Sequence, residues 1–203
     1  MGTITLQPDA ASGNDAYIKS GGAATTNYGA SDTLLTGELD DGTSGLHRAF
    51  IKFDLSSIPI GPVKIESATL TLTHINDYAS NTRTMYVRQV YRNWIESEIT
   101  WNIYSTGNNW QTAGASGSGD TGNWFGVSVG SISIPHNQGL GSTVSVSIST
   151  DITTLKTYYG FVLWMETEEN DGHGFASSDH ANSSYRPKLV VTYRTLDSVL
   201  MVQ

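Results

Sequence analysis

Two acidic loops bring together the oxygen-bearing side chains that bind a hard cation. One loop lies near the start of the chain, and the other contains the stretch Gly-Glu-Leu-Asp-Asp-Gly. Carboxylate and carbonyl oxygens are the ligands that calcium takes in proteins. Ordinary Asx-turns on an acidic protein are the alternative for both loops. The candidate calcium ligands are Asp9, Asn14 and Asp15 in the first loop and Glu38, Asp40 and Asp41 in the second.

Large aromatic side chains lie in or next to a polar stretch near residues 103–123. Sugar-binding surfaces use exposed aromatic rings as platforms, with polar groups beside them. The alternative is that these rings fold down over the body of the protein as core side chains. Both interpretations stay open for the candidate glycan platform, which consists of Tyr104, Trp110 and Trp124.

Patterns typical of catalysis are missing. No nucleophile elbow, zinc-protease helix or phosphate-binding loop occurs in the sequence. Paired carboxylates could hydrolyse a glycosidic bond, but Glu166, Glu168, Glu169 and Asp171 crowd one strand end and its turn, where acids are usually solvated. His173 and His180 could meet near Asp179, although single exposed histidines are the simpler expectation. We therefore expect a protein that is not an enzyme.

Composition narrows the class of protein further. The chain has 203 residues, a net charge of −8 and no cysteine, so disulfides and thiolate metal sites are excluded. The acidic balance leaves no basic surface for nucleic acid or an anionic membrane. No apolar run approaches the ~18 residues of a membrane span. The first residues lack a cationic segment and an apolar run, which predicts a protein made without a secretory leader.

The segments that must position these residues have the sequence pattern of β-strands. Apolar and polar residues alternate along 64–74, 84–91 and 143–149, and Gly, Asn and Asp separate such runs. Weaker alternation elsewhere brings the total to about ten strands. The only helical signal is one turn over 152–158. Many short strands with this spacing predict an all-β fold, an antiparallel β-sandwich of the jelly-roll type.

Several stretches carry a resemblance to a known family. The longest are Arg-Ala-Phe-Ile-Lys-Phe-Asp-Leu-Ser-Ser-Ile-Pro at 48–59 and Ser-Ala-Thr-Leu-Thr-Leu at 67–72. Shorter pieces follow the family's order at 27–29, 94–102, 151–153, 160–163, 175–179 and 186–193. Together they resemble the DNRLRE family, also called disaggregatase-related. The resemblance implies a jelly-roll sandwich, often attached to polysaccharide-degrading enzymes or cell-surface proteins. Some relatives are treated as carbohydrate-binding modules, and similar domains occur in phage structural proteins.

The residues that match the family also have a structural interpretation. Arg48 and Arg186 stand beside strand cores, and the family-matched acids Glu96 and Asp179 could pair with them. We expect these four residues to form structural ion pairs. The expected core between the sheets includes Phe50, Phe53, Leu70, Leu72, Trp101, Phe161, Leu163 and Val190.

The last residues form an apolar tail beyond the family's final strand. We expect a single domain over 1–194, with a long Gly- and Ser-rich surface loop near 103–123, followed by a tail over 195–203. Apolar side chains left in water forgo burial, so the tail needs a groove on another subunit or on its own sandwich. The candidate interface residues are Leu196, Val199, Leu200, Met201 and Val202.

Two functions from different classes follow. The first is a non-enzymatic attachment protein of a virion, such as a phage capsid decoration or tail accessory protein, which acts through contacts with other protein subunits. The second is an extracellular carbohydrate-binding module that recognises a polysaccharide. Calcium is the candidate cofactor for either, and neither involves nucleic acid or a membrane. The sequence favours the first by analogy more than by chemistry.

Overall fold

The computed structural model describes residues 1–39, 45–59, 63–121, 128–148, 159–167 and 171–196. Thirteen strands lie in these ranges: β1 (Gly2–Leu6), β2 (Asn14–Lys19), β3 (Thr33–Glu38), β4 (Leu46–Lys52), β5 (Val63–Asp77), β6 (Arg83–Gln89), β7 (Ile103–Ser105), β8 (Asn108–Asn109), β9 (Ser128–Ile134), β10 (Thr143–Ser147), β11 (Phe161–Met165), β12 (His173–Ala176) and β13 (Lys188–Thr195). The helical elements there are α1 (Ser118–Thr121) and two three-residue 3-10 turns, Gly21–Ala23 and Ser183–Tyr185. None of these helices is long enough to cross a membrane.

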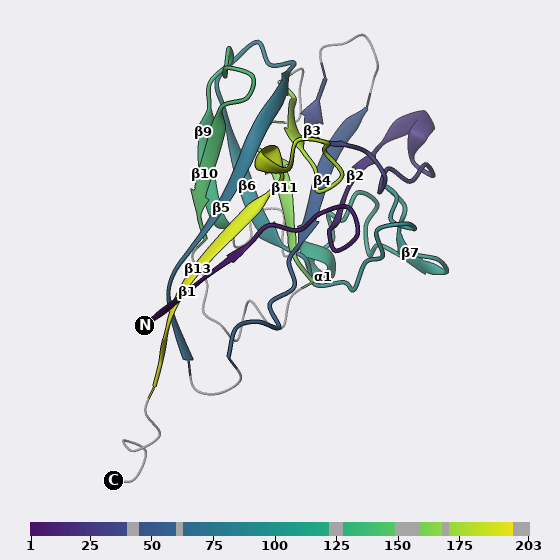
Figure 1. The fold of residues 1–203 in the computed structure, drawn as a ribbon. Coiled ribbons are helices and arrows are strands. Elements are labelled where there is room, and N and C mark those ends of the chain that lie inside the picture. Colours follow the sequence, from purple (N-terminus) through teal and green to yellow (C-terminus); the bar gives the residue numbers. More distant parts are fainter. Residues whose placement is uncertain (40–44, 60–62, 122–127, 149–158, 168–170, 197–203) are drawn as a thin grey trace.

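Eleven of these strands form one curled, antiparallel sheet (Figure 1). The strand order is β1-β13-β5-β12-β3-β4-β11-β6-β9, with β10 paired to β5 and β2 paired to β4. The sheet folds over on itself, so that β1, β13, β5 and β10 face β4, β11, β6 and β9 across a shared core. The predicted all-β antiparallel sandwich is confirmed. The helical turn expected over 152–158 lies outside the described residues.

The main core fills the space between the two layers, and alternation in the sequence explains it. On β5 and β10 the residues Leu70, Leu72, Val144 and Val146 point inward and are at most 5 % exposed. The hydroxyl side chains between them face outward, as a strand with a period of two requires. The burial of apolar side chains on both inner faces stabilises the sandwich.

One expected core residue points the other way. On β13 the side chains of Leu189 and Val191 are fully buried. Val190 lies between them and is only half-buried, because successive side chains of a strand point to opposite faces. The prediction that Val190 lies between the sheets is therefore wrong.

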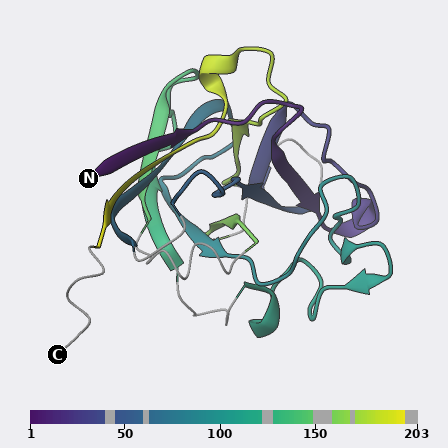
Figure 2. The same ribbon diagram turned by 60° about the horizontal axis from the view of Figure 1, so that its bottom comes forward.

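A second core covers the outer face of β4 and β11. In Figure 2 the chain from residue 90 to residue 121, drawn in teal, lies at the right beside the purple strands. Phe50 belongs to this core, not to the main one, and its ring stacks on Trp110 with centroids 5.5 Å apart. The covering residues come from the segment between β6 and β9, including Trp94 and Ile99, while Trp101 packs there half-buried. The stretch expected as a surface loop thus carries β7, β8 and α1 and shields one face of the sandwich.

Candidate functional site

Three acidic side chains meet where the ends of distant segments come together. Asp15 lies on β2, Glu96 lies in the connection after β6, and Asp179 follows β12. One carboxylate oxygen from each lies within 4.8 Å of the others. Asp15 is 1 % exposed, whereas Glu96 and Asp179 are half-buried. We call this group, with the hollow beside it, the acidic pocket.

Backbone hydrogen bonds hold the acids in place. The Asp15 N–H donates to Glu96 Oε1 at 2.9 Å, and the Ser178 N–H donates to Asp15 Oδ2 at 2.8 Å. Asp15 Oδ1 is buried and has no hydrogen-bond partner among the described residues. A buried oxygen without a partner is costly, so this atom marks a place where a proton or a cation is favoured.

Close backbone contacts shape the wall of the pocket. A Cβ atom on Gly29 would overlap the backbone oxygen of Glu96, so only glycine lets the two segments approach. The side-chain amide of Asn27 donates to the carbonyl oxygens of Glu96 and Ile99 at 2.7 and 2.8 Å. These contacts fix the position of Glu96 from its backbone, leaving its carboxylate to face the other acids.

Burial makes the ionised acids unfavourable. It raises the pKa of Asp15 to about 7, while hydrogen bonds from Ser178 lower this pKa and the charges of Glu96 and Asp179 raise it. Burial also raises the pKa of Glu96 and of Asp179. A group of three carboxyls with raised pKa values either keeps protons or takes up a cation.

A hollow of about 230 Å³ opens beside the acids and gives them access to solvent. It is lined by Ala10, Asn27, Gly29, Ala30, Glu96, Ser97 and Asp179. Asp15 is buried and is not part of this lining. The arrangement offers hydrogen-bond acceptors and a place for a hard cation.

The structure divides the expected calcium ligands. Asp15 joins the acidic pocket, but Asp9 is exposed and its Oδ1 accepts hydrogen bonds from Ala11 and Ser12, as in an Asx-turn. Asn14 is exposed and Glu38 is half-buried. Asp40 and Asp41 lie outside the described residues. The partners of Asp15 come from distant segments, Glu96 and Asp179, and not from its own loop.

The expected glycan platform is largely covered. Trp110 is 4 % exposed, and its Nε1–H donates to the carbonyl oxygen of Thr100 at 2.9 Å. Of the two interpretations left open for Trp110, the structure supports the one in which the ring folds down as a core side chain, because it packs on Phe50 in the second core. Tyr104 is half-buried against Trp110, with centroids 5.5 Å apart. Trp124 lies outside the described residues.

The expected ion pairs of Arg48 and Arg186 are replaced by other contacts. Arg48 donates from Nη1 to the carbonyl oxygen of Gly114, and its guanidinium lies 3.4 Å from the ring centroid of Trp164. Arg186 donates from Nε to the carbonyl oxygen of His180 at 3.0 Å, although its charge lowers the pKa of Asp179 against the effect of burial. The proposed partners, Glu96 and Asp179, gather in the acidic pocket instead.

The remaining expectations have mixed outcomes. Leu196 is 42 % exposed, and Val199, Leu200, Met201 and Val202 lie outside the described residues.

The acids considered for catalysis differ in exposure. Asp171 is 1 % exposed and forms an ion pair with Arg83 Nε at 2.7 Å, so it is not a solvated charge. Glu166 is exposed, and Glu168 and Glu169 lie outside the described residues.

The sequence interpretation missed a group of side chains around His173. This histidine is fully buried and contacts His74, not the more exposed His180. The expectation of a single exposed histidine at position 173 is wrong. Only the pairing of β5 with β12 brings the two rings together, so no local spacing in the sequence signals it.

The sequence of the chain matches the model of a known protein family. The family model described as carbohydrate-binding module family 96 matches residues 7–193, a span that contains the whole acidic pocket. No curated protein matches the chain. The family match agrees with the carbohydrate-binding part of the expected resemblance.

Proposed function

The chain belongs to carbohydrate-binding module family 96, and from this membership we propose that it binds a polysaccharide at the acidic pocket. The observation that carries the proposal is the match over residues 7–193, because it spans every segment that builds the pocket. The match supports this function over the virion attachment that the sequence favoured. Contacts with other protein subunits through the tail stay a prediction.

The accessible acids provide the recognition chemistry. Glu96 and Asp179 line the hollow and are half-buried, so their carboxylates can accept hydrogen bonds from sugar hydroxyls. Hydrogen bonds to an ionised acceptor are about twice as strong as neutral ones. Asp15 is too deeply buried to reach a sugar, and its part is to hold Glu96 through the backbone N–H.

Calcium fits the same donors and is the proposed cofactor. Asp15, Glu96 and Asp179 supply hard oxygen atoms, and the unpartnered Asp15 Oδ1 is a buried acceptor that a cation would satisfy. A bound calcium ion would offset two of the three carboxylate charges and offer a Lewis-acidic centre to sugar hydroxyls. Glu96 and Asp179 can accept hydrogen bonds from a sugar whether or not a calcium ion is bound.

We expect binding without cleavage, as is typical of a carbohydrate-binding module. Incubating the protein with each polysaccharide that it binds should release no reducing ends. Release that is lost in the Glu166→Gln variant would overturn this expectation.

Affinity electrophoresis tests the proposed function. The protein is run through gels that contain neutral or anionic polysaccharides, with either calcium or EDTA. We expect at least one polysaccharide to retard the protein, and retardation that EDTA removes would support calcium in the pocket. If none of a broad panel retards the protein, the proposed function is wrong.

A further inference from the structure

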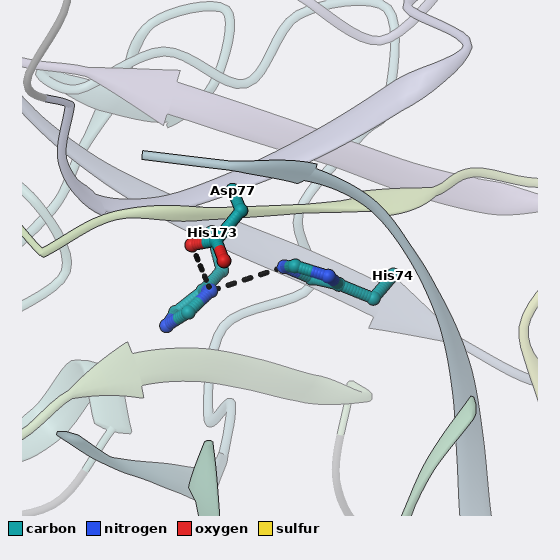
Figure 3. A group of neighbouring side chains, drawn as sticks. All are labelled: His74, Asp77 and His173. Atoms are coloured by element: carbon teal, nitrogen blue, oxygen red, sulfur yellow. Dashed lines mark hydrogen bonds and ion pairs between the residues drawn. The ribbon is translucent and has the colours of Figure 1, made fainter. Parts of the chain in front are cut away.

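Two histidines and an aspartate converge at the neighbouring strands β5 and β12 (Figure 3). His74 and Asp77 lie on β5, and His173 lies on the neighbouring strand β12. His173 pairs with Asp77, but Phe175 pairs with His74, so the register shifts by one residue between Gly174 and Phe175. Residues three apart on a regular strand point to opposite faces. The bulge lets His74 and Asp77 reach the same histidine.

Hydrogen bonds define which ring atoms carry lone pairs. His74 Nδ1 lies 3.1 Å from the carbonyl oxygen of Gln138, which only accepts, so this nitrogen carries the proton of the neutral ring. The other nitrogen, His74 Nε2, therefore carries a free lone pair. It lies 3.0 Å from His173 Nδ1. His173 Nδ1 also lies 3.5 Å from Asp77 Oδ1. One proton on His173 Nδ1 is shared between two acceptors.

The surroundings keep both rings neutral. His74 and His173 are fully buried. Burial and the neighbouring His74 lower the pKa of His173 to about 4, against the raising effect of Asp77 and Asp171. Burial also lowers the pKa of His74, against a raising effect of Asp77 and Gln138. A neutral imidazole is the form that binds a metal ion.

We propose that His74 Nε2, His173 Nδ1 and the Asp77 carboxylate bind a divalent first-row transition-metal ion, with zinc as the representative ion. Two imidazoles and one carboxylate suit borderline ions such as zinc, whereas calcium takes oxygen ligands alone. When the ion takes the place of the proton on His173 Nδ1, the neutral ring carries its proton on Nε2, a buried atom that has no hydrogen-bond partner among the described residues. This site goes beyond the proposed function and does not depend on it.

The distances and outer contacts agree with such an ion. Two nitrogen ligands on a tetrahedral zinc ion lie roughly 3.3 Å apart, so the rings need to separate only slightly from 3.0 Å. The Gln138 carbonyl orients His74, and the Ala79 N–H donates to Asp77 Oδ1 at 3.1 Å. Such outer partners are usual around metal ligands. The Asp77 side chain is 18 % exposed, which gives the ion a route from solvent.

Zinc and cobalt titrations of the full chain test the proposal. After chelation and desalting, calorimetry should show one zinc ion per chain, and cobalt should give the intense visible absorption of a four-coordinate centre. Asp77→Asn keeps the shape of the side chain and should weaken zinc binding at least about tenfold. His74→Gln should remove the cobalt absorption. The controls His136→Gln, an exposed histidine, and Glu96→Gln, in the acidic pocket, should bind as the wild type does.

A spectroscopic measurement on the wild type protects the test against variants that fail to fold. Zinc should shift the ring ¹⁵N resonances of His74 Nε2 and His173 Nδ1. The proposal is wrong if the wild type takes up no zinc, or if these two resonances stay in place. It is also wrong if Asp77→Asn binds zinc as tightly as the wild type, or if Glu96→Gln abolishes the binding.

Discussion

The acidic pocket and the histidine group each gather three ionisable side chains from segments distant in the sequence, but the two groups suit different ligands. The acidic pocket offers only oxygen atoms and opens into a hollow. The histidine group offers two buried nitrogens and one oxygen, and its access to solvent is through Asp77, whose side chain is 18 % exposed. The comparison teaches that donor type and access, not the number of titratable residues, decide which ligand a group can hold.

Burial also shifts the pKa values of the two groups in opposite directions. It raises the pKa of Asp15 to about 7 and lowers the pKa of His173 to about 4, because it disfavours the charged form of each. Between pH 4 and 7 the folded protein holds the proton on Asp15 that the unfolded chain has lost. Between pH 4 and 6.5 the unfolded chain holds the proton on His173 that the folded protein lacks. As pH rises through these ranges, the ionisation of Asp15 lowers the free energy of unfolding, whereas the deprotonation of His173 raises it.

The largest expected effect comes from removing the buried charge of the acidic pocket. Asp15→Asn should raise the free energy of unfolding of the metal-free protein at pH 8 by up to roughly 4 kcal/mol. The gain should shrink as pH falls from 7 to 4, since the wild-type carboxyl then becomes protonated in the folded state. Urea unfolding at several pH values measures it. A constant difference between the two proteins from pH 4.5 to 8 would contradict the account.

The next largest effect is the rise in melting temperature on ion binding, which distinguishes the acidic pocket (calcium) from the histidine group (zinc). At a concentration 100 times its Kd, an ion that binds only the folded state adds about 2.7 kcal/mol. Calcium should therefore raise the melting temperature of the wild type and of Asp77→Asn, but not of Glu96→Gln. Zinc should raise the melting temperature of the wild type and of Glu96→Gln, but not of Asp77→Asn. If one variant loses both responses, the two groups are not independent.

A smaller effect concerns the backbone contact that shapes the acidic pocket. Gly29→Ala should destabilise the protein by about 1–3 kcal/mol, because the added methyl group overlaps the backbone of Glu96. Gly22→Ala is the matched control, since nothing lies within 4 Å of its Cβ position. Thermal unfolding compares the two. Equal melting temperatures for both variants would show that the contact at Gly29 does not constrain the pocket.

The sequence was sufficient for the strands but not for which face each one buries. Alternation located β5 and β10 because each has one buried and one open face. It failed for Phe50, because β4 is buried on both sides and the second core comes from a distant segment. A pattern with a period of two cannot say which of two covered faces a side chain enters.

The candidate site was visible only in pieces. Asp15, Glu96 and Asp179 were each singled out from the sequence, but for separate roles, and only the folded chain brings them together. His74 and Asp77 are three residues apart, a spacing that excludes a shared face in a regular strand. The bulge between Gly174 and Phe175 makes their convergence possible, and no pattern in the sequence predicted this bulge.

Polysaccharide binding by pocket variants tests the central claim most directly. Isothermal titration of a retarding polysaccharide into the wild type, the double variant Glu96→Gln/Asp179→Asn and the control Glu166→Gln compares three folded proteins of nearly identical shape. We predict that the double variant loses at least about tenfold in affinity, equivalent to 1.4 kcal/mol, while the exposed control binds as the wild type does. A double variant that binds with wild-type affinity would contradict the assignment of the acidic pocket as the sugar-binding site.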